Sequence, residues 1–193
     1  MQKVIGIVGS GRKNSNSRKL IEIALETMKR NGFEIELIDV LDLNFSGCIE
    51  CNECRKTGEC AIADDLTPIY EKLVRTDGII ISAPVYFYSL PGQIKLLVDR
   101  FQALWARRYV LNIQPDKRRF GGLISVAGSN GNKVFNGVLL PIKYFYISQG
   151  IDFIEPLLFR GFDKNPEDIS EEMLAEVREW ANDFAGKMSG IDN

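Results

Sequence analysis

The sequence predicts an α/β fold, built on a parallel sheet with helices on both faces. The first observation is that short apolar runs, rich in Val and Ile, alternate along the chain with longer segments of helical period. The second is that residues 4–8 and 78–82 carry no charge and no polar alternation, which is typical of strands buried on both faces. Because strands that alternate with helices pair in parallel, this order indicates one doubly wound sheet.

We expect five strands, at residues 4–8, 34–39, 78–82, 121–127 and 151–158. The helices are predicted from apolar residues at three- and four-residue spacing. One ends at Asn31-Gly32, one begins at Asp64-Asp65, one contains residues 94–101, one covers about residues 133–149, and the last begins at Ser170. Five strands in this rhythm fit the flavodoxin-like order 2-1-3-4-5, in which a ligand lies at the carboxyl ends of strands one and three.

The chain is long enough for one domain, which we expect to cover residues 1–193. Two segments interrupt the regular alternation: a cysteine-containing loop at residues 44–63, and a polar, basic and irregular insertion at residues 105–119. No apolar run reaches the roughly 18 residues of a membrane span, and a net charge of −2 gives no overall attraction to nucleic acid. Because residues 1–8 enter a strand directly and do not resemble a secretory signal, we expect a cytoplasmic protein without membrane or nucleic-acid partners.

The sequence contains no histidine. This excludes Ser–His–Asp and Cys–His catalysis, His-ligated metals and imidazole acid–base chemistry. We therefore name no catalytic side chain. Any reaction must depend on a cofactor, on thiols, or on hydroxyl, amide and guanidinium groups.

All of the cysteines lie close together, with the spacing C-x2-C-x2-C-x5-C. They are Cys48, Cys51, Cys54 and Cys60. Thiolates at this spacing can surround a cube of iron and sulfide, and four Cys ligands without His are what a [4Fe–4S] cluster requires. We therefore interpret this loop as an iron–sulfur site.

Three other interpretations of the cysteines stay open. Disulfides need oxidising surroundings, which a chain without a secretory signal does not suggest. Structural zinc sites usually combine two C-x2-C pairs separated by a longer loop, whereas here all four sulfurs come from one tight loop. The third alternative is a set of free thiols that only pack the loop.

The loop after the first strand has the composition of a phosphate-binding site. Its glycines let backbone N–H groups approach an anion, and the following helix N-terminus favours negative charge. The candidate ligands are Ser10, Arg12, Ser15, Asn16 and Ser17. The loop lacks the third glycine of the dinucleotide fingerprint and the Gly-Lys-Ser/Thr of a Walker A loop. Five donors in one short loop fit a terminal monophosphate; the alternative is an ordinary polar turn that caps a helix.

The loop after the third strand is aromatic where polar residues are usual. Pro84 restricts the backbone, and Tyr86, Phe87 and Tyr88 offer flat apolar surfaces. This combination suits a planar ring system at the tip of the strand, although the same aromatics could belong to the core or to a subunit interface. Residues 128–132, after the fourth strand, offer small residues and backbone donors where the far edge of such a ring would lie.

On these motifs the chain resembles the NADPH-dependent FMN reductase group of the flavodoxin-like superfamily, and within that group the iron–sulfur flavoproteins. The likeness is carried by Gly9-Ser10-x-Arg12 with Ser15-Asn16-Ser17, by Pro84-Val85-Tyr86-Phe87 with Pro91-Gly92, Lys95 and Asp99-Arg100, and by the cysteine motif with Asp64-Asp65 after it. The cysteine motif separates the iron–sulfur flavoproteins from the many other reductases that share the flavin motif.

The resemblance implies one FMN and one [4Fe–4S] cluster per subunit, in a homodimer or homotetramer where a cluster lies near a flavin at a subunit contact. By their motif positions, the five residues of the first loop would hold the FMN phosphate. The residues along the isoalloxazine would be Pro84, Val85, Tyr86 and Phe87, with Gly128 and Ser129 beyond. The four cysteines would ligate the iron.

The expected function is electron transfer between a one-electron donor such as ferredoxin and a small acceptor, through the cluster and FMN. The basic residues 107–108 and 117–119 could dock an acidic ferredoxin, although a solvated loop explains such a charge run at least as well. An alternative is an NAD(P)H-dependent FMN or quinone reductase without a functional cluster. A third, non-enzymatic alternative is a redox sensor that responds to oxidation of the cysteines.

Overall fold

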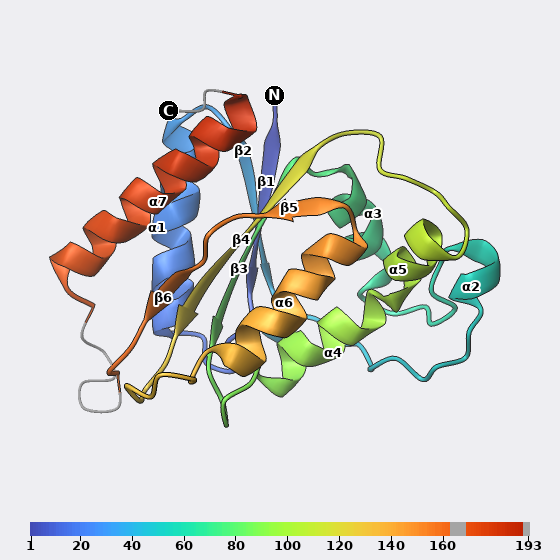
Figure 1. Ribbon diagram of the computed structural model, residues 1–193, viewed down its shortest axis with the longest axis horizontal. Helices are drawn as coiled ribbons and strands as arrows, with labels where there is room; N and C mark the ends of the chain where they lie inside the picture. The colour runs from blue at the N-terminus through green and yellow to red at the C-terminus, as the bar shows by residue number, and fades with distance from the viewer. Residues whose placement is uncertain (163–168, 191–193) are drawn as a thin grey trace.

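The computed structural model describes residues 1–162 and 169–190, and its centre is a parallel sheet with helices on both faces (Figure 1). The strand order is β2-β1-β3-β4-β5, which confirms the predicted flavodoxin-like topology. The strands are β1 (Lys3–Val8), β2 (Glu34–Asp39), β3 (Gly78–Pro84), β4 (Arg119–Val126), β5 (Ile151–Phe153) and β6 (Leu157–Phe159). The helices are α1 (Asn16–Arg30), η1 (Val40–Asp42), α2 (Cys54–Thr57), α3 (Thr67–Arg75), α4 (Gly92–Arg100), α5 (Gln102–Tyr109), α6 (Asn136–Ser148) and α7 (Glu171–Ser189).

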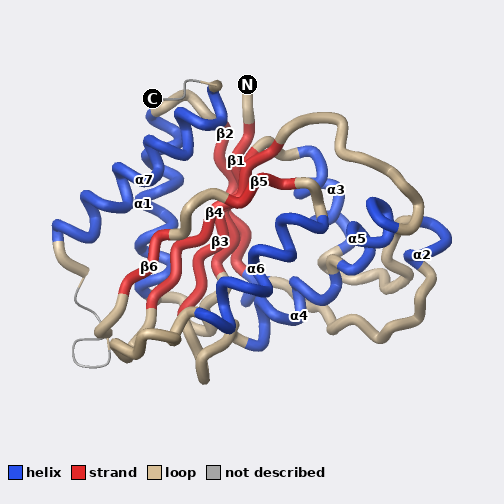
Figure 2. The backbone as a smooth tube through the Cα atoms, viewed as in Figure 1, coloured by secondary structure: helices blue, strands red, loops and turns tan. Residues whose placement is uncertain are grey.

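Figure 2 shows helices on both sides of the sheet, and the sheet separates two apolar cores. One core joins the sheet to α1 and α7, and the other joins it to α3, α4, α5 and α6. Successive residues of a strand point to opposite faces, so Ile79 and Ile81 enter one core and Ile80 the other. None of the described helices combines the length and the hydrophobicity needed to cross a membrane.

Two consecutive glycines in β4 let an aromatic ring approach each face of the sheet. A methyl group on Gly121 would lie 2.5 Å from the ring of Tyr146, and one on Gly122 would lie 2.5 Å from Trp180. Tyr146 is fully buried and donates a hydrogen bond from Oη to the carbonyl of Gly122, at 2.8 Å. Any larger residue at these two positions would push a helix away from the sheet.

The last predicted strand, residues 151–158, is wrong as a single element. The chain instead forms two short strands, β5 and β6, which both pair in parallel with β4. The interruption coincides with Pro156, which has no N–H for the ladder. Helix α3 begins at Thr67, a little after the predicted Asp64-Asp65, and α6 is shorter than the predicted residues 133–149. Ser170 caps α7 as predicted, accepting from the backbone N–H of Met173.

The expected irregular insertion at residues 105–119 is also corrected at both ends. Residues 105–109 belong to helix α5, and Arg119 is the first residue of β4. The helix was missed because its buried residues, Ala103, Leu104 and Ala106, make only a short apolar stripe. Residues 110–118 lie in neither helix nor strand.

Arg119 is a structural residue and cannot reach a partner surface. The residue is 4% exposed, and its guanidinium donates hydrogen bonds to the carbonyls of Leu73, Val74 and Gln149, at 2.9, 3.1 and 2.5 Å. These carbonyls belong to the ends of α3 and α6, where the helix dipole is negative and favours a cation. Arg119 therefore joins two helix C-termini beneath the sheet.

We expect Arg119→Ala to lower the free energy of unfolding by about 3 kcal/mol, because three buried carbonyls lose a charged donor. Arg118→Ala is the matched control, since the Arg118 side chain is 73% exposed and contacts only the exposed Asp152 among described carboxylates. Its effect should stay within about 0.5 kcal/mol. Urea unfolding of both variants measures the difference, and equal effects would contradict the assignment of Arg119.

Candidate functional site

Three loops that follow β1, β3 and β4 meet at the carboxyl edge of the sheet. The first loop starts with Gly9, whose N–H donates to the carbonyl of Ser82 at 2.8 Å. A methyl group on Gly11 would lie 3.9 Å from the Tyr86 hydroxyl, and one on Gly131 would lie 2.8 Å from the Tyr88 hydroxyl. The aromatic loop therefore contacts the loop on each side of it.

Most of the predicted phosphate ligands are buried in the first loop. Ser10, Ser15, Asn16 and Ser17 are each at most 5% exposed, whereas Arg12 is exposed. Ser15 caps helix α1 by accepting from the backbone N–H of Arg18. The buried Oγ of Ser17 has no hydrogen-bond partner among the described residues. A buried hydroxyl without a partner costs free energy, so this atom is suited to an absent ligand.

Arg18, at the start of α1, is a residue that the sequence did not single out. It pairs with Asp39 at the end of β2 and with Glu22 one turn along its own helix. The pKa of Arg18 is raised, because its two carboxylate partners outweigh the burial that would lower it. This pair ties the phosphate loop to the neighbouring strand, a contact between distant segments that no local motif reveals.

The aromatic loop contains a tight turn with unusual backbone angles. Tyr86 and Ser89 exchange two backbone hydrogen bonds, of 3.0 and 2.9 Å, around Phe87 and Tyr88. Both central residues have positive φ, 49° and 59°, as in the type I′ turns that normally use Asn-Gly. A bulky residue in this region costs about 1 kcal/mol or more. Strain of this kind is concentrated at functional sites, and here it projects Phe87 entirely into solvent.

The other predicted ring contacts lie beside this turn. Pro84 ends β3, and the Val85 N–H donates to the carbonyl of Val126 at 2.9 Å. Val85 is half-buried, while Tyr86 is 43% exposed. Gly128 and Ser129 are half-exposed residues just beyond β4. The structure thus brings all of the predicted phosphate and ring residues to one edge of the sheet.

The four cysteines line one cavity of about 670 Å³, on the side of the molecule that carries α4, α5 and α6. Cys48 and Cys51 are exposed, Cys54 and Cys60 are half-buried, and all four are free thiols. The opposite wall includes Trp105, Tyr144 and Phe145. Cys54 begins the one-turn helix α2, which the sequence did not predict.

The cysteine loop has a strained backbone of its own. Glu50 and Asn52, on either side of Cys51, have φ of 55° and 63°, and Gly58 has φ of 76°. These residues turn the chain sharply between successive cysteines. Burial raises the pKa of the Cys54 thiol, and the negative charges of the other three thiols raise it further.

Residues 1–162 and 169–190 contain no group of three or more Cys, Asp or Glu that could hold a single metal ion. A cubane spaces its four thiolates more widely than one zinc ion does, because each thiolate binds a different iron. Four thiols around one cavity of about 670 Å³ fit the larger group.

The base of the cysteine loop is held by Arg100 and Asp64. The guanidinium donates hydrogen bonds to both Asp64 carboxylate oxygens, at 2.6 and 3.2 Å. Burial would raise the pKa of Asp64, but the hydrogen bonds from Arg100 and from two backbone amides outweigh it and lower the pKa. The sequence predicted a helix that begins at Asp64-Asp65; the Asp64 carboxylate accepts from the backbone N–H of Leu66, just before α3, and also pairs with Arg100, which the sequence did not predict.

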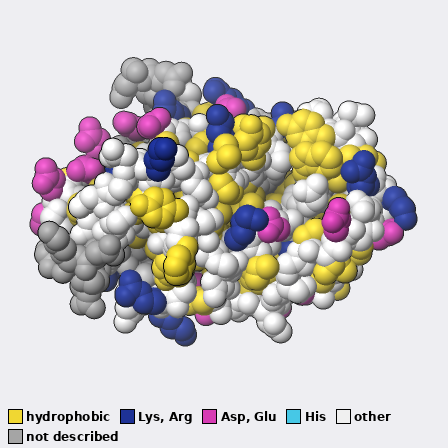
Figure 3. Space-filling view, turned by 60° about the horizontal axis from the view of Figure 1, so that its bottom comes forward, with side chains coloured by type: hydrophobic (Ala, Val, Ile, Leu, Met, Phe, Trp, Pro, Cys, Tyr) yellow, Lys and Arg dark blue, Asp and Glu magenta, His cyan; other side chains and the backbone are white. Residues whose placement is uncertain are grey.

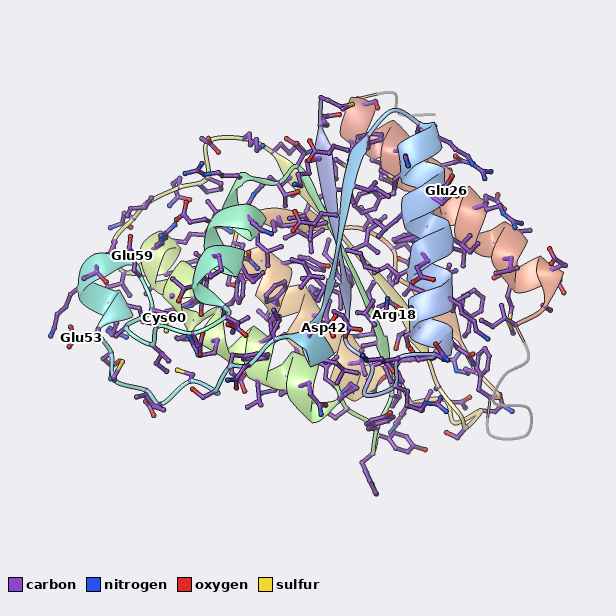
Figure 4. All side chains as sticks on the ribbon, turned by 180° about the vertical axis from the view of Figure 1, so that it is seen from behind. Arg18, Glu26, Asp42, Glu53, Glu59 and Cys60 are labelled. Carbon is purple, nitrogen blue, oxygen red and sulfur yellow. The ribbon has the colours of Figure 1, made fainter. Side chains whose placement is uncertain are left out.

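The cysteine loop lies on the side of the sheet covered by α4, α5 and α6, whereas the predicted phosphate loop, residues 9–17, leaves the carboxyl edge. Figure 4 shows Glu53, Glu59 and Cys60 grouped at one end of the molecule, apart from Arg18 and Glu26 on α1. No residue predicted to contact phosphate or a planar ring lines the cysteine cavity. The structure therefore forms two separate candidate sites within one chain.

Comparison with known proteins places these two sites in a family context. The family model for NADPH-dependent FMN reductase matches residues 2–148. The iron–sulfur flavoprotein of Methanosarcina thermophila is 40% identical over 132 residues, which are 68% of this chain and 66% of that protein. An iron–sulfur flavoprotein of Archaeoglobus fulgidus is 34% identical over 77% of this chain and 73% of its own length. An NAD(P)H:quinone oxidoreductase of Solanum tuberosum is 30% identical over 67% of this chain and 60% of its own length.

Solved structures support the same fold. The NAD(P)H:quinone oxidoreductase from Methanothermobacter marburgensis has a TM-score of 0.75 at 18% identity and covers 94% of this chain and 95% of its own. A flavone reductase has a TM-score of 0.72 at 18% identity, over 98% of this chain and 64% of its own.

The match to the Methanosarcina relative spans 66% of that protein, just under two thirds. With a family model matched over most of its length, this chain belongs to the NADPH-dependent FMN reductase family.

Proposed function

We propose that this protein is an iron–sulfur flavoprotein, which carries electrons between a one-electron donor such as ferredoxin and a small acceptor. The observation that supports it most directly is the single cavity lined by Cys48, Cys51, Cys54 and Cys60. Relatives at 31–40% identity also carry the name iron–sulfur flavoprotein. When bound, FMN would supply one- and two-electron chemistry and the cluster one-electron chemistry.

The residues of the carboxyl edge fit FMN. The unpartnered Oγ of Ser17 would donate to a phosphate oxygen, next to the N-terminus of α1 and the cation of Arg12. Tyr86 and its neighbours would contact the planar ring, with Gly128 and Ser129 along its far edge. Their role would be to bind and orient the flavin and to limit its contact with water. No acid–base side chain is needed, which agrees with the lack of histidine.

The separation of the two sites favours a homo-oligomer. Electron transfer needs a flavin near the cysteine cavity, yet that cavity is lined by none of the candidate flavin ligands of its own chain. Figure 3 shows apolar side chains exposed among charged ones on the lower face of the molecule. Leu96, Leu140 and Tyr144, on α4 and α6, are 42%, 59% and 61% exposed. A homodimer or homotetramer formed through these helices would cover them and bring a second chain to the cavity.

The second candidate is an NAD(P)H-dependent FMN or quinone reductase that has no functional cluster. It is favoured by the family description and by the quinone oxidoreductase from potato among the relatives. The two candidates differ in their need for iron and in their direct electron donor.

We expect protein prepared without oxygen to contain about four irons, four acid-labile sulfides and one FMN per chain. Metal analysis, sulfide assay and flavin extraction measure these contents. Cys54→Ser is expected to remove most of the iron while leaving FMN in place, because the two sites are separate. One FMN without iron or sulfide, together with rapid bleaching by NADPH, would favour the second candidate.

We expect Ser17→Ala to weaken FMN binding about tenfold to a hundredfold, because one hydrogen bond to a charged group is lost. The free protein should keep its thermal stability, since the Ser17 Oγ has no partner to lose among the described residues. Flavin fluorescence titration of the FMN-free protein measures the affinity, and thermal unfolding of the same sample is the control. Unchanged affinity would contradict the phosphate assignment.

A further inference from the structure

Arg100 is a fully buried cation at the base of the cysteine loop. Its side chain is 0% exposed, although it ends helix α4 next to the 670 Å³ cavity. Besides the two bonds to Asp64, it donates to the carbonyls of Ser46 and Ile62, at 2.9 and 3.1 Å. Ser46 lies two residues before Cys48, and Ile62 lies two residues after Cys60. One guanidinium therefore holds both ends of the ligand-bearing segment.

A second arginine contacts the far end of the same loop. Arg107, on α5, donates from Nε to the carbonyl of Gly58 at 2.7 Å, two residues before Cys60. The adjacent Arg108 instead bonds the carbonyl of Ile147 on α6 and does not line the cysteine cavity. The α4–α5 segment thus supplies one arginine to the base of the loop and one to its tip.

Cys60 lines the same cavity as Arg100 and lies two residues before Ile62, whose carbonyl accepts from Arg100 at 3.1 Å. The Tyr70 Oη donates to the Arg100 carbonyl at 2.7 Å. The Nε of Arg100 is buried and has no hydrogen-bond partner among the described residues. A free buried donor on the wall of this cavity is suited to a group that carries negative charge.

We propose that Arg100 is a positioning residue for the cluster ligand Cys60: it shapes the cysteine loop before iron is present and places a positive charge on the wall of the cavity that the four cysteines line. This inference rests on the proposed function, because it assumes that the four thiols hold an iron–sulfur cluster. Hydrogen bonds to ligand sulfurs and nearby charge are among the factors that set cluster potentials. Since reduction adds one electron to the cluster, a buried cation favours the reduced state.

The two roles of Arg100 are separable by substitution. Lysine keeps the charge but lacks the planar fork that joins the carboxylate to two carbonyls, so Arg100→Lys removes the bracing alone. Arg100→Gln removes the charge as well. Arg108→Gln is the matched control, because it removes an arginine–carbonyl bond from the neighbouring helix without touching the loop.

The bracing is tested on protein without iron, by following alkylation of each cysteine with iodoacetamide by mass spectrometry. We expect Cys60 of Arg100→Lys to react at least about tenfold faster than in the native protein, because the half-buried thiol becomes accessible. The rate of Cys60 alkylation in Arg108→Gln should stay within about twofold of the native rate. Equal rates in the native protein and in Arg100→Lys would overturn the positioning role. Because no cluster is needed, this result stands even if the proposed function fails.

The charge is tested on the reconstituted holoprotein by redox titration of the cluster. We expect Arg100→Gln to lower the midpoint potential by about 59 mV, which is a tenfold change in the equilibrium constant for one-electron reduction. In Arg100→Lys and Arg108→Gln this equilibrium constant should stay within about twofold of the native value. A shift in Arg100→Gln no larger than that in Arg108→Gln would overturn the electrostatic role. Native protein that takes up no iron or sulfide would instead refute the proposed function, which the alkylation experiment does not test.

Discussion

The arrangement of this protein depends on the parallel pairing of β1 with β3 and of β3 with β4. In a parallel sheet all strands end at the same edge, so the loops that leave these three strands must meet. Residues far apart in sequence, such as Gly11, Tyr86 and Gly131, are therefore brought into one site. The cores on both faces keep the strands in register, and the loops only need to supply chemistry at a fixed edge.

The cysteine loop is maintained by a different kind of interaction. Residues 44–53 form no helix or strand, although Phe45, Cys54 and Cys60 of the loop pack against the core. Its backbone carbonyls at Ser46 and Gly58 accept hydrogen bonds from Arg100 and Arg107, and the Ser46 N–H donates to the Asp64 carboxylate. A buried ion pair contributes little net stability compared with apolar packing, but it imposes a specific geometry. That property suits a segment whose four sulfurs must surround one ligand.

Both candidate sites contain residues with left-handed backbone conformations that glycine would adopt more easily. Phe87 and Tyr88 do so in the aromatic turn, and Glu50 does so between two cysteines. Each of these backbone conformations raises the free energy locally, and the surrounding structure stabilises it.

The sequence alone was sufficient to predict the fold class and the strand order. Strand and helix periods are local properties, and the cysteine and phosphate motifs are contiguous, so each could be recognised without tertiary information. The first predicted strand, residues 4–8, differs from the observed β1, Lys3–Val8, by one residue. The family membership followed from the same contiguous motifs.

Only the tertiary structure decided which charges are structural and which elements are interrupted. Arg119 reads as part of a basic loop, but it is buried beneath two helix ends. Asp64 precedes a predicted helix, and nothing at that position shows that it pairs with Arg100, which lies 36 residues away in sequence. The partner of a charged side chain depends on which distant segments the sheet brings together. Local pattern carries no information about that pairing, whereas it carries most of the information about strands and helices.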